Sequence, residues 1–405
     1  MSPVISGRDL SAGVTRVNIT PQPAEGAFMT GYTSKPDMPA EGVHDPLYAR
    51  VLVLADGSTT IALVTLDLIS LNPGRLPELI RDLGVDSLLL AATHTHGGPL
   101  VLDLGEPYAE NRSWPDSTPY LTWLEGRIAQ AVASALSATT PVRMALGRGV
   151  ADIAFNRRQL IDGEVDMVWG QNRDRSHDWG PVDPEVAVWR IDREDGTPLA
   201  VLANYACHPV VMGSGNRLFT ADFPGAALDW LDSRLGGAMS FFLQGGCGDI
   251  DPYIDVQDDF TAVRNQGEEL ARTIESIYRS IGPNDALDLS SGLSWQERRQ
   301  SFPRFGDHPG YQEVAYGVLR IGADLAFGVL PGEPFVELQL DLKRRSPVRH
   351  TLLLGYTNGY PGYFPTLRTH REGGYGASYG NTIHIQPPAG ETMIDTMVET
   401  LTAPS

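Results

Sequence analysis

Short apolar segments alternate with amphipathic stretches along this chain, and this alternation limits the fold more than any other feature. Residues 50–55, 60–66, 87–92, 200–205, 239–244, about 320–329 and 351–356 have the composition of buried strands. A helical period of apolar residues appears at about 118–138, 225–235, 262–281 and 334–344. The alternation predicts an α/β fold with a mixed β-sheet core and flanking helices.

The chain is predicted to form one unit, residues 1–405, because no Ser/Gly- or Pro-rich linker divides it and no repeat of fixed period appears. A change of composition near residue 285 is consistent with a subdomain boundary. Long Gly-, Asp- and aromatic-rich loops are expected at 103–117, 161–184, 248–260 and 358–380. Three of them directly follow an apolar strand, which favours a cleft at the strand C-termini over plain surface excursions.

The charge balance excludes several classes of partner. There are 50 acidic and 31 basic residues, giving a formal net charge of −19, which disfavours nucleic acid and anionic lipid. No run of eighteen apolar residues and no secretory signal is visible, so we expect no stable membrane insertion and a cytoplasmic location. The two cysteines, Cys207 and Cys247, are expected to be small buried residues rather than nucleophiles.

Three of the nine histidines stand where predicted strands end. His94 and His96 follow the segment 87–92, and on an extended backbone residues i and i+2 point to the same face. His208 follows the segment 200–205. Imidazole is the commonest protein ligand for zinc, and a catalytic zinc keeps one position open for water or substrate. A single histidine is more often an ordinary hydrogen-bonded residue, so only the three histidines together indicate a metal site.

Other polar candidates also lie at predicted strand ends. Glu333 stands in Pro331-Gly-Glu-Pro334, where the dipole of the following helix would keep it ionised, although a plain capping carboxylate fits equally well. The segment 355–366 is rich in tyrosine, which can ligate a metal, stabilise an oxyanion or simply pack against the core. Arg157 is suited to a carboxylate or oxyanion, or to a solvated surface. Asp249 and Asp251 follow a Gly-rich turn and could orient a histidine.

These segments, taken in order, resemble the neutral (alkaline, non-lysosomal) ceramidases. The resemblance rests on Ala91-Ala-Thr-His-Thr-His-Gly-Gly-Pro99, Asn156-Arg157, Asn204-Tyr-Ala-Cys-His-Pro209, Gln244-Gly-Gly-Cys-Gly-Asp249, Pro331-Gly-Glu333 and the tyrosine segment 357–379. The motifs extend over essentially the whole chain. The motif around His94 is fairly specific to this family, whereas the other motifs are informative because they occur in the family's order.

The resemblance implies a zinc amidohydrolase whose metal is held by two histidines, a glutamate and a tyrosine. Transferred motif by motif, these ligands are His94, His208, Glu333 and Tyr363. The resemblance further implies that His96, Arg157 and Tyr375 line the substrate amide. The family carries a serine where this chain has Asp251, so a serine mechanism is not expected here. The family's C-terminal immunoglobulin-like domain and secretion signal have no counterpart, as expected of a short bacterial ceramidase-like member.

The functional prediction is zinc-dependent hydrolysis of a C–N amide bond in a small N-acyl compound by a metal-activated water. Two alternatives remain at this stage. One is ester hydrolysis or acyl-transfer ring closure on the same scaffold, and the other is a non-catalytic protein that binds a metal or ligand. No nucleic-acid partner is expected, and the sequence leaves the oligomeric state open.

Overall fold

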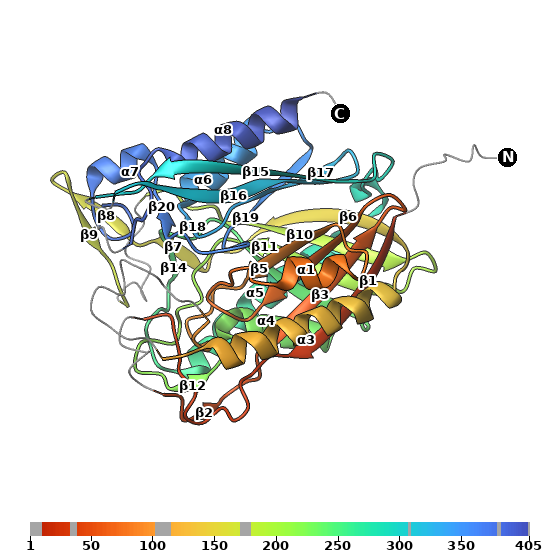
Figure 1. Ribbon diagram of the computed structural model, residues 1–405, viewed down its shortest axis with the longest axis horizontal. Coiled ribbons are helices and arrows are strands. Elements are labelled where there is room, and N and C mark those ends of the chain that lie inside the picture. Colours follow the sequence, from red (N-terminus) through yellow and green to blue (C-terminus); the bar gives the residue numbers. More distant parts are fainter. Residues whose placement is uncertain are drawn as a thin grey trace.

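A computed structural model describes residues 10–32, 39–101, 115–170, 180–306, 309–378 and 382–403. Its largest sheet has eight strands in the order β13-β11-β10-β6-β1-β3-β4-β5 (Figure 1). Their bounds are β1 Ser11–Asn18, β3 Tyr48–Ala55, β4 Thr60–Leu66, β5 Ser87–Ala92, β6 Thr140–Val150, β10 Glu185–Arg193, β11 Pro198–Tyr205 and β13 Met239–Gln244. The β4–β5 and β11–β13 pairs are parallel and the β3–β4 hairpin is antiparallel, so the sheet is mixed.

A second sheet has four strands in the order β15-β16-β17-β19, with bounds β15 Leu293–Pro303, β16 Tyr311–Ile321, β17 Leu325–Val329 and β19 His350–Leu354. Short two-stranded pairs complete the strand set: β2 Gly42–Val43 with β12 Leu218–Phe219, β7 Ala154–Asn156 with β14 Ile250–Pro252, β8 Arg158–Ile161 with β9 Glu164–Met167, and β18 Glu333–Pro334 with β20 Tyr363–Phe364. The four-stranded sheet begins just after residue 285, where the composition changes.

The helices within the described residues are α1 Leu76–Arg81, α3 Thr118–Ser137, α4 Asp222–Asp232, α5 Phe260–Ser280, α6 Val336–Arg345, α7 Leu367–Glu372 and α8 Ala389–Thr402, and the same residues include a 3₁₀ turn, Pro283–Asp285. None of the described helices is both long and apolar enough to cross a membrane. The predicted α/β class, with a large mixed sheet and flanking helices, is confirmed.

The elements stack in four layers (Figure 1). Alternate residues of β3 show the arrangement: Val51 and Val53 pack toward α1 and α3, whereas Leu52 and Leu54 pack toward the four-stranded sheet. Helices α4 and α5 cover the β10–β11 half, and α6 and α8 cover the outer face of the second sheet. Because both faces of the central strands are buried, their sequences are almost continuously apolar.

Three predicted boundaries are wrong for local reasons. The strand expected at about 320–329 is two strands, because Gly322, with φ +64°, starts a turn between β16 and β17. The helix expected from 334 begins at Val336, because Pro334 belongs to β18. The strand expected to reach 356 ends at Leu354. Most of the predicted loop 103–117 lies outside the described residues, and the other three long loops contain β9, β14, β20 and α7.

Candidate metal centre

The site is assembled where the two edges of the eight-stranded sheet meet. The edge strands β5 and β13 contact each other although they stand at opposite ends of the strand order. Gln244, the last residue of β13, donates from Nε2 to the carbonyl oxygens of Thr93, beyond β5, and of Cys207, beyond β11. The buried amide of Gln244 thus joins the two loops that carry the histidines.

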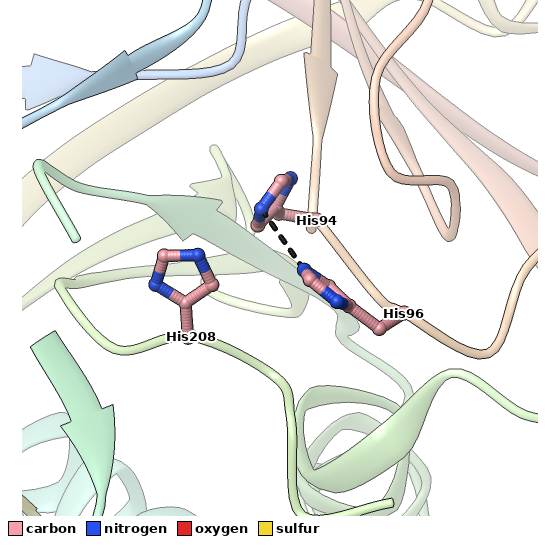
Figure 2. A group of neighbouring side chains, drawn as sticks. All are labelled: His94, His96 and His208. Atoms are coloured by element: carbon pink, nitrogen blue, oxygen red, sulfur yellow. Dashed lines mark hydrogen bonds between the residues drawn. The ribbon is translucent and has the colours of Figure 1, made fainter. Parts of the chain in front are cut away.

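His94 is held in an unusual backbone conformation. Its φ is +69°, in the left-handed region, so the extended backbone assumed in the sequence analysis is wrong at this residue. The two imidazoles nevertheless converge, since Nε2 of His94 lies 3.2 Å from Nε2 of His96 (Figure 2). Nδ1 of His94 lies 2.7 Å from the carbonyl oxygen of Ile69, which can only accept, so Nδ1 is the protonated nitrogen. Nε2 of neutral His94 therefore presents a lone pair to the site.

His208 is oriented in the same way. Its Nδ1 lies 3.2 Å from the carbonyl oxygen of Ile250 and also bonds the carbonyl oxygen of Cys247, which leaves Nε2 facing Glu333. The separation of Nε2 from Oε2 of Glu333 is 3.0 Å. Both His94 and His208 are completely buried. The anchors on the far side of each ring fix its orientation, as is usual for metal-binding histidines.

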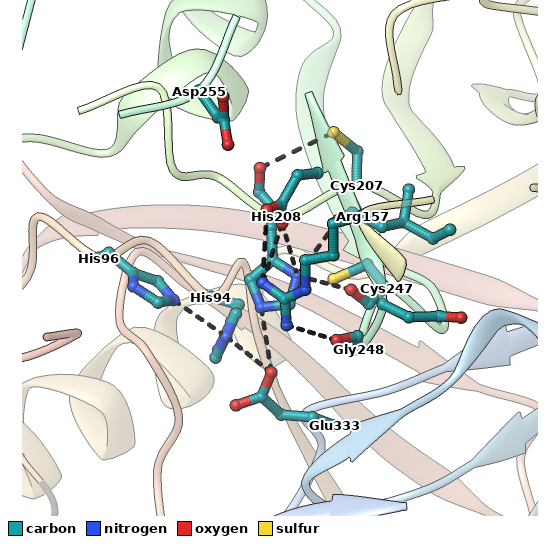
Figure 3. A network of polar contacts seen from close by, with 12 residues as sticks. His94, His96, Arg157, Cys207, His208, Cys247, Gly248, Asp255 and Glu333 are labelled. Atoms are coloured by element: carbon teal, nitrogen blue, oxygen red, sulfur yellow. Dashed lines mark hydrogen bonds and ion pairs between the residues drawn. The ribbon is translucent and has the colours of Figure 1, made fainter. Parts of the chain in front are cut away.

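Glu333 completes the group. Its Oε2 lies 3.4 Å from Nε2 of His94 (Figure 3). Tyr360 donates a hydrogen bond to its Oε1. Burial alone would raise the pKa of Glu333, but its contacts with the imidazoles of His94 and His208 hold that pKa well below its usual range. The helix dipole invoked from sequence is not the main cause, because β18 and the N-cap Phe335 precede the helix.

The donor atoms fit a tetrahedral zinc. Two ligand atoms at about 2.1 Å from such an ion are about 3.4 Å apart. The separations of Oε2 of Glu333 from the two imidazoles, 3.0 and 3.4 Å, match this spacing. In addition, one ligand nitrogen from each of His94, His96 and His208 lies within 4.8 Å of the others. A set of imidazole nitrogens with one carboxylate is typical of zinc and other transition metals rather than Mg²⁺ or Ca²⁺.

Arg157 lies beside this group and is buried, which excludes the solvated-surface alternative. Its Nη1 lies 3.1 Å from Oδ1 of Asp251, and its Nη2 donates to the carbonyl oxygen of Gly248 at 2.6 Å (Figure 3). Nη2 also lies 3.3 Å from the hydroxyl of Tyr363. Burial opposes the charge of Arg157, but Asp251 and its other acidic neighbours raise its pKa well above the usual range. Arg157 is therefore a fixed cation at the edge of the histidine cluster.

The tyrosines are arranged differently from what spacing alone suggests. Tyr363 pairs with Glu333 across β18 and β20, and its hydroxyl contacts Arg157. The ring of Tyr375 lies 5.6 Å from that of Tyr363. The hydroxyls of Tyr360 and Tyr356 both contact the carboxylate of Glu333. The assignment of Tyr363 as a metal ligand stays a prediction.

The two aspartates of the Gly-rich turn have separate partners. Asp251 lies 3.7 Å from Nδ1 of His208, but its closer contact is with Arg157. Asp249 accepts hydrogen bonds from the side chain of Asn156 and from the backbone N–H of Val336, so it connects β7 to α6 rather than orienting a histidine.

The sequence offered Tyr360 only as one of the tyrosines of the segment 355–366, without singling it out, and it did not indicate Trp169. Both lie in segments recognised as aromatic loops. The spacing of tyrosines in a Gly-rich loop does not say which hydroxyl faces the carboxylate. Trp169 covers the guanidinium of Arg157, whose central carbon lies 4.8 Å from the indole ring centre. Cys207 and Cys247 are buried free thiols, as expected.

Comparisons with known proteins all point to one family. Residues 10–266 match the family model described as neutral/alkaline non-lysosomal ceramidase, N-terminal. The neutral ceramidase of Pseudomonas aeruginosa is 23% identical over 263 residues, which are 60% of this chain and 37% of that protein. The crystal structure of that ceramidase superposes with a TM-score of 0.78 and 18% identity, covering 98% of this chain and 76% of the other.

A second solved structure, described as ceramidase complexed with C2, gives a TM-score of 0.77 at 18% identity, over 98% of this chain and 75% of that one. The aligned part thus spans little more than a third of the curated relative, whereas the fold is shared over nearly the whole of this chain. The family model covers more than half of the sequence. This chain belongs to the neutral/alkaline non-lysosomal ceramidase family.

Proposed function

We propose that this protein is a zinc-dependent hydrolase that cleaves the C–N amide bond of an N-acyl compound. The observation that carries the proposal is the convergence, in a fully buried position, of the Nε2 atoms of His94 and His208 on one carboxylate oxygen of Glu333. The name of the Pseudomonas relative, neutral ceramidase, supports an amide of a fatty acid as the substrate class.

The residues that would hold zinc are His94, His208, Glu333 and Tyr363. Arg157 supports the choice of Tyr363, because a neighbouring cation stabilises the phenolate form that ligation requires. When bound, zinc supplies a Lewis acid that polarises a carbonyl oxygen and lowers the pKa of water toward about 7.

The remaining residues supply proton transfer and charge. Hydrolysis adds a water oxygen to the carbonyl carbon and delivers one proton to the amide nitrogen as the C–N bond breaks. His96 would hold that proton; the position of its Nε2 beside His94 and the partial exposure of its ring support this role. The Tyr375 hydroxyl and the Arg157 guanidinium would stabilise negative charge on the carbonyl oxygen. Each well-placed donor contributes about 3–4 kcal/mol to such a transition state.

The test separates metal binding from turnover. Purified wild-type protein, His94→Ala, His96→Asn and the control His350→Asn are analysed for bound zinc and for hydrolysis of matched fatty-acyl amides and esters. His350 is a buried histidine at the start of β19, outside the cluster. We expect about one zinc in the wild type and the control, none in His94→Ala, and zinc with turnover slowed about 100-fold or more in His96→Asn.

Each outcome has a consequence. Loss of zinc from His96→Asn makes His96 a ligand and overturns its role in proton transfer. Removal of zinc by a chelator should abolish hydrolysis, and added zinc should restore it. Faster hydrolysis of the ester than of the matched amide is expected from intrinsic reactivity; hydrolysis of the ester alone would refute the amidase. Zinc-loaded protein that cleaves neither would point to a non-catalytic role.

A further inference from the structure

Asp255 is a buried carboxylate to which the proposed chemistry assigns no role. It lies in the loop between β14 and α5, and its exposed fraction is 0%. Its Oδ2 accepts a hydrogen bond from the backbone N–H of Gly170 at 2.9 Å. Its Oδ1 is buried and has no hydrogen-bond partner among the described residues. Leaving such an oxygen unsatisfied costs about 1–3 kcal/mol or more, so a partner from outside the described residues is indicated.

The position of Asp255 connects it to the candidate site. Trp169 lies over the guanidinium of Arg157, and the next residue, Gly170, binds the carboxylate of Asp255. Two adjacent residues therefore contact the side chains of Arg157 and Asp255, one through its indole ring and the other through its backbone N–H. In Figure 3 the carboxylate of Asp255 points toward the histidine cluster from a separate loop. Nε of Arg157 is also buried without a partner among the described residues, so an unused donor accompanies the unused acceptor.

In its ionised form the carboxylate of Asp255 can only accept hydrogen bonds, so a donor is the partner that suits it. Burial, helped by the negative charge of Asp251, raises the pKa of Asp255 to about 7, and Arg157 acts in the opposite direction. Arg157 is already paired with Asp251 at 3.1 Å, so Asp255 has no ion-pair partner of its own among the residues described. A hydroxyl group can donate a hydrogen bond to Oδ1 of Asp255.

We propose that Asp255 is a specificity-determining residue, whose Oδ1 accepts a hydrogen bond from a hydroxyl group on the amine half of the substrate. This rests on the proposed amide hydrolysis. The amine half is indicated because a saturated acyl chain carries no hydrogen-bond donor. A site built around a buried acceptor discriminates strongly against an analogue that lacks the donor, since the acceptor is then left unpaired.

The experiment compares two amides that differ only in hydroxyl groups, N-acyl serinol and N-acyl isopropylamine, with the same acyl chain. We expect the zinc-loaded wild type to prefer the serinol amide. In Asp255→Asn, which keeps an acceptor for Gly170 but replaces the free oxygen by a donor, kcat/KM for the serinol amide should fall about 10- to 100-fold. For the isopropylamine amide it should change by less than about 3-fold, within the range of indirect effects.

The matched control is Asp192→Asn. Asp192 likewise has a buried oxygen without a partner among the described residues. It pairs with Pro198 at the beginning of β11, however, whereas the site lies beyond the other end of that strand, where His208 follows. The control should keep the wild-type preference. If Asp255→Asn does not fold, Asp255→Glu, which keeps the charge and displaces the oxygen, should likewise reduce the preference.

A binding measurement separates this inference from the proposed function. Calorimetry with N-alkyl serinol and N-alkyl isopropylamine, which have no amide to cleave, should show tighter binding of the serinol compound to the wild type and loss of that difference in Asp255→Asn. Equal kcat/KM of the wild type for both amides, or an unchanged preference in Asp255→Asn, overturns the role of Asp255 and leaves the hydrolase intact. Absence of hydrolysis by the wild type overturns the proposed function, and calorimetry then decides the role of Asp255 alone.

Discussion

The buried ion pair between Arg157 and Asp251 allows a quantitative test of how the site is stabilised. The two side chains are 3% and 0% exposed, and Nη1 lies 3.1 Å from Oδ1. Two unit charges 4 Å apart attract by about 4 kcal/mol at an effective dielectric constant of about 20. Removing each ion from water costs several kcal/mol, so the intact pair contributes little net stability.

Breaking the pair has a different cost, because it leaves one charge buried and alone. Asp251→Asn and Arg157→Met should each lower the free energy of unfolding by about 3–5 kcal/mol. In the double variant no unpaired charge remains, and the loss relative to wild type should be about 1–2 kcal/mol, for the bond from Arg157 to Gly248 that is also removed. The two substitutions should therefore be strongly non-additive, with a coupling energy of about 4 kcal/mol or more.

The assay is urea unfolding of the four proteins at fixed pH and equal zinc content, followed by tryptophan fluorescence and far-UV circular dichroism. Coincident transitions are required before free energies are compared. Zinc content is measured in parallel, because Asp251 also lies 3.7 Å from Nδ1 of His208. Additive losses, or single variants that each cost less than about 1 kcal/mol, would refute the reasoning, since such costs are typical of solvated surface pairs.

Two further perturbations probe the support of the site and a buried carboxylate away from the ligands. Gly332→Ala should lower the unfolding free energy by about 2 kcal/mol or more and reduce bound zinc, because φ is +63° and a Cβ would lie 2.3 Å from the carbonyl oxygen of Gly362. Gly57→Ala, with φ +80° and open space, should cost only about 1 kcal/mol and leave zinc unchanged. Burial raises the pKa of Asp67 from 3.8 to about 7, so the folded state holds that proton more tightly than the unfolded state. The unfolding free energy should fall by about 3 kcal/mol from pH 4 to pH 7 in metal-free protein; Asp67→Asn should remove this fall, and an equal pH dependence in both proteins would contradict the assignment.

The strands were the most predictable part of the structure, for a physical reason. β3, β4, β5, β11 and β13 are covered on both faces, by helices on one side and by the second sheet or the site loops on the other, so their sequences carry a continuous apolar signal. Helices α3 and α5 were predictable from their apolar period because each exposes one face to water. The division of residues 320–329 into two strands was hidden, because both strands are apolar and only Gly322 marks the turn.

The candidate site was predictable in its members more than in its contacts. Residue type and position at strand ends indicated His94, His96, His208 and Glu333, and the structure brings all four together. The contacts of Tyr360 with Glu333 depend on the path of a Gly-rich loop, which side-chain chemistry does not determine.

His94 and His96 converge as the sequence predicts, but not for the reason that the sequence suggests. The expectation used the two-residue period of a strand, yet β5 ends at Ala92 and His94 adopts a left-handed conformation. What directs the two rings is tertiary: Ile69 fixes one face of His94, and Gly31 approaches His96 so closely that a Cβ there would lie 2.7 Å from its Cα. A strained backbone persists only where its surroundings hold it. The geometry of this site therefore depends on how the two sheet edges pack. Gln244 joins those edges and has no described contact with Glu333. A substitution at Gln244 should nevertheless disturb metal binding as a ligand mutation does.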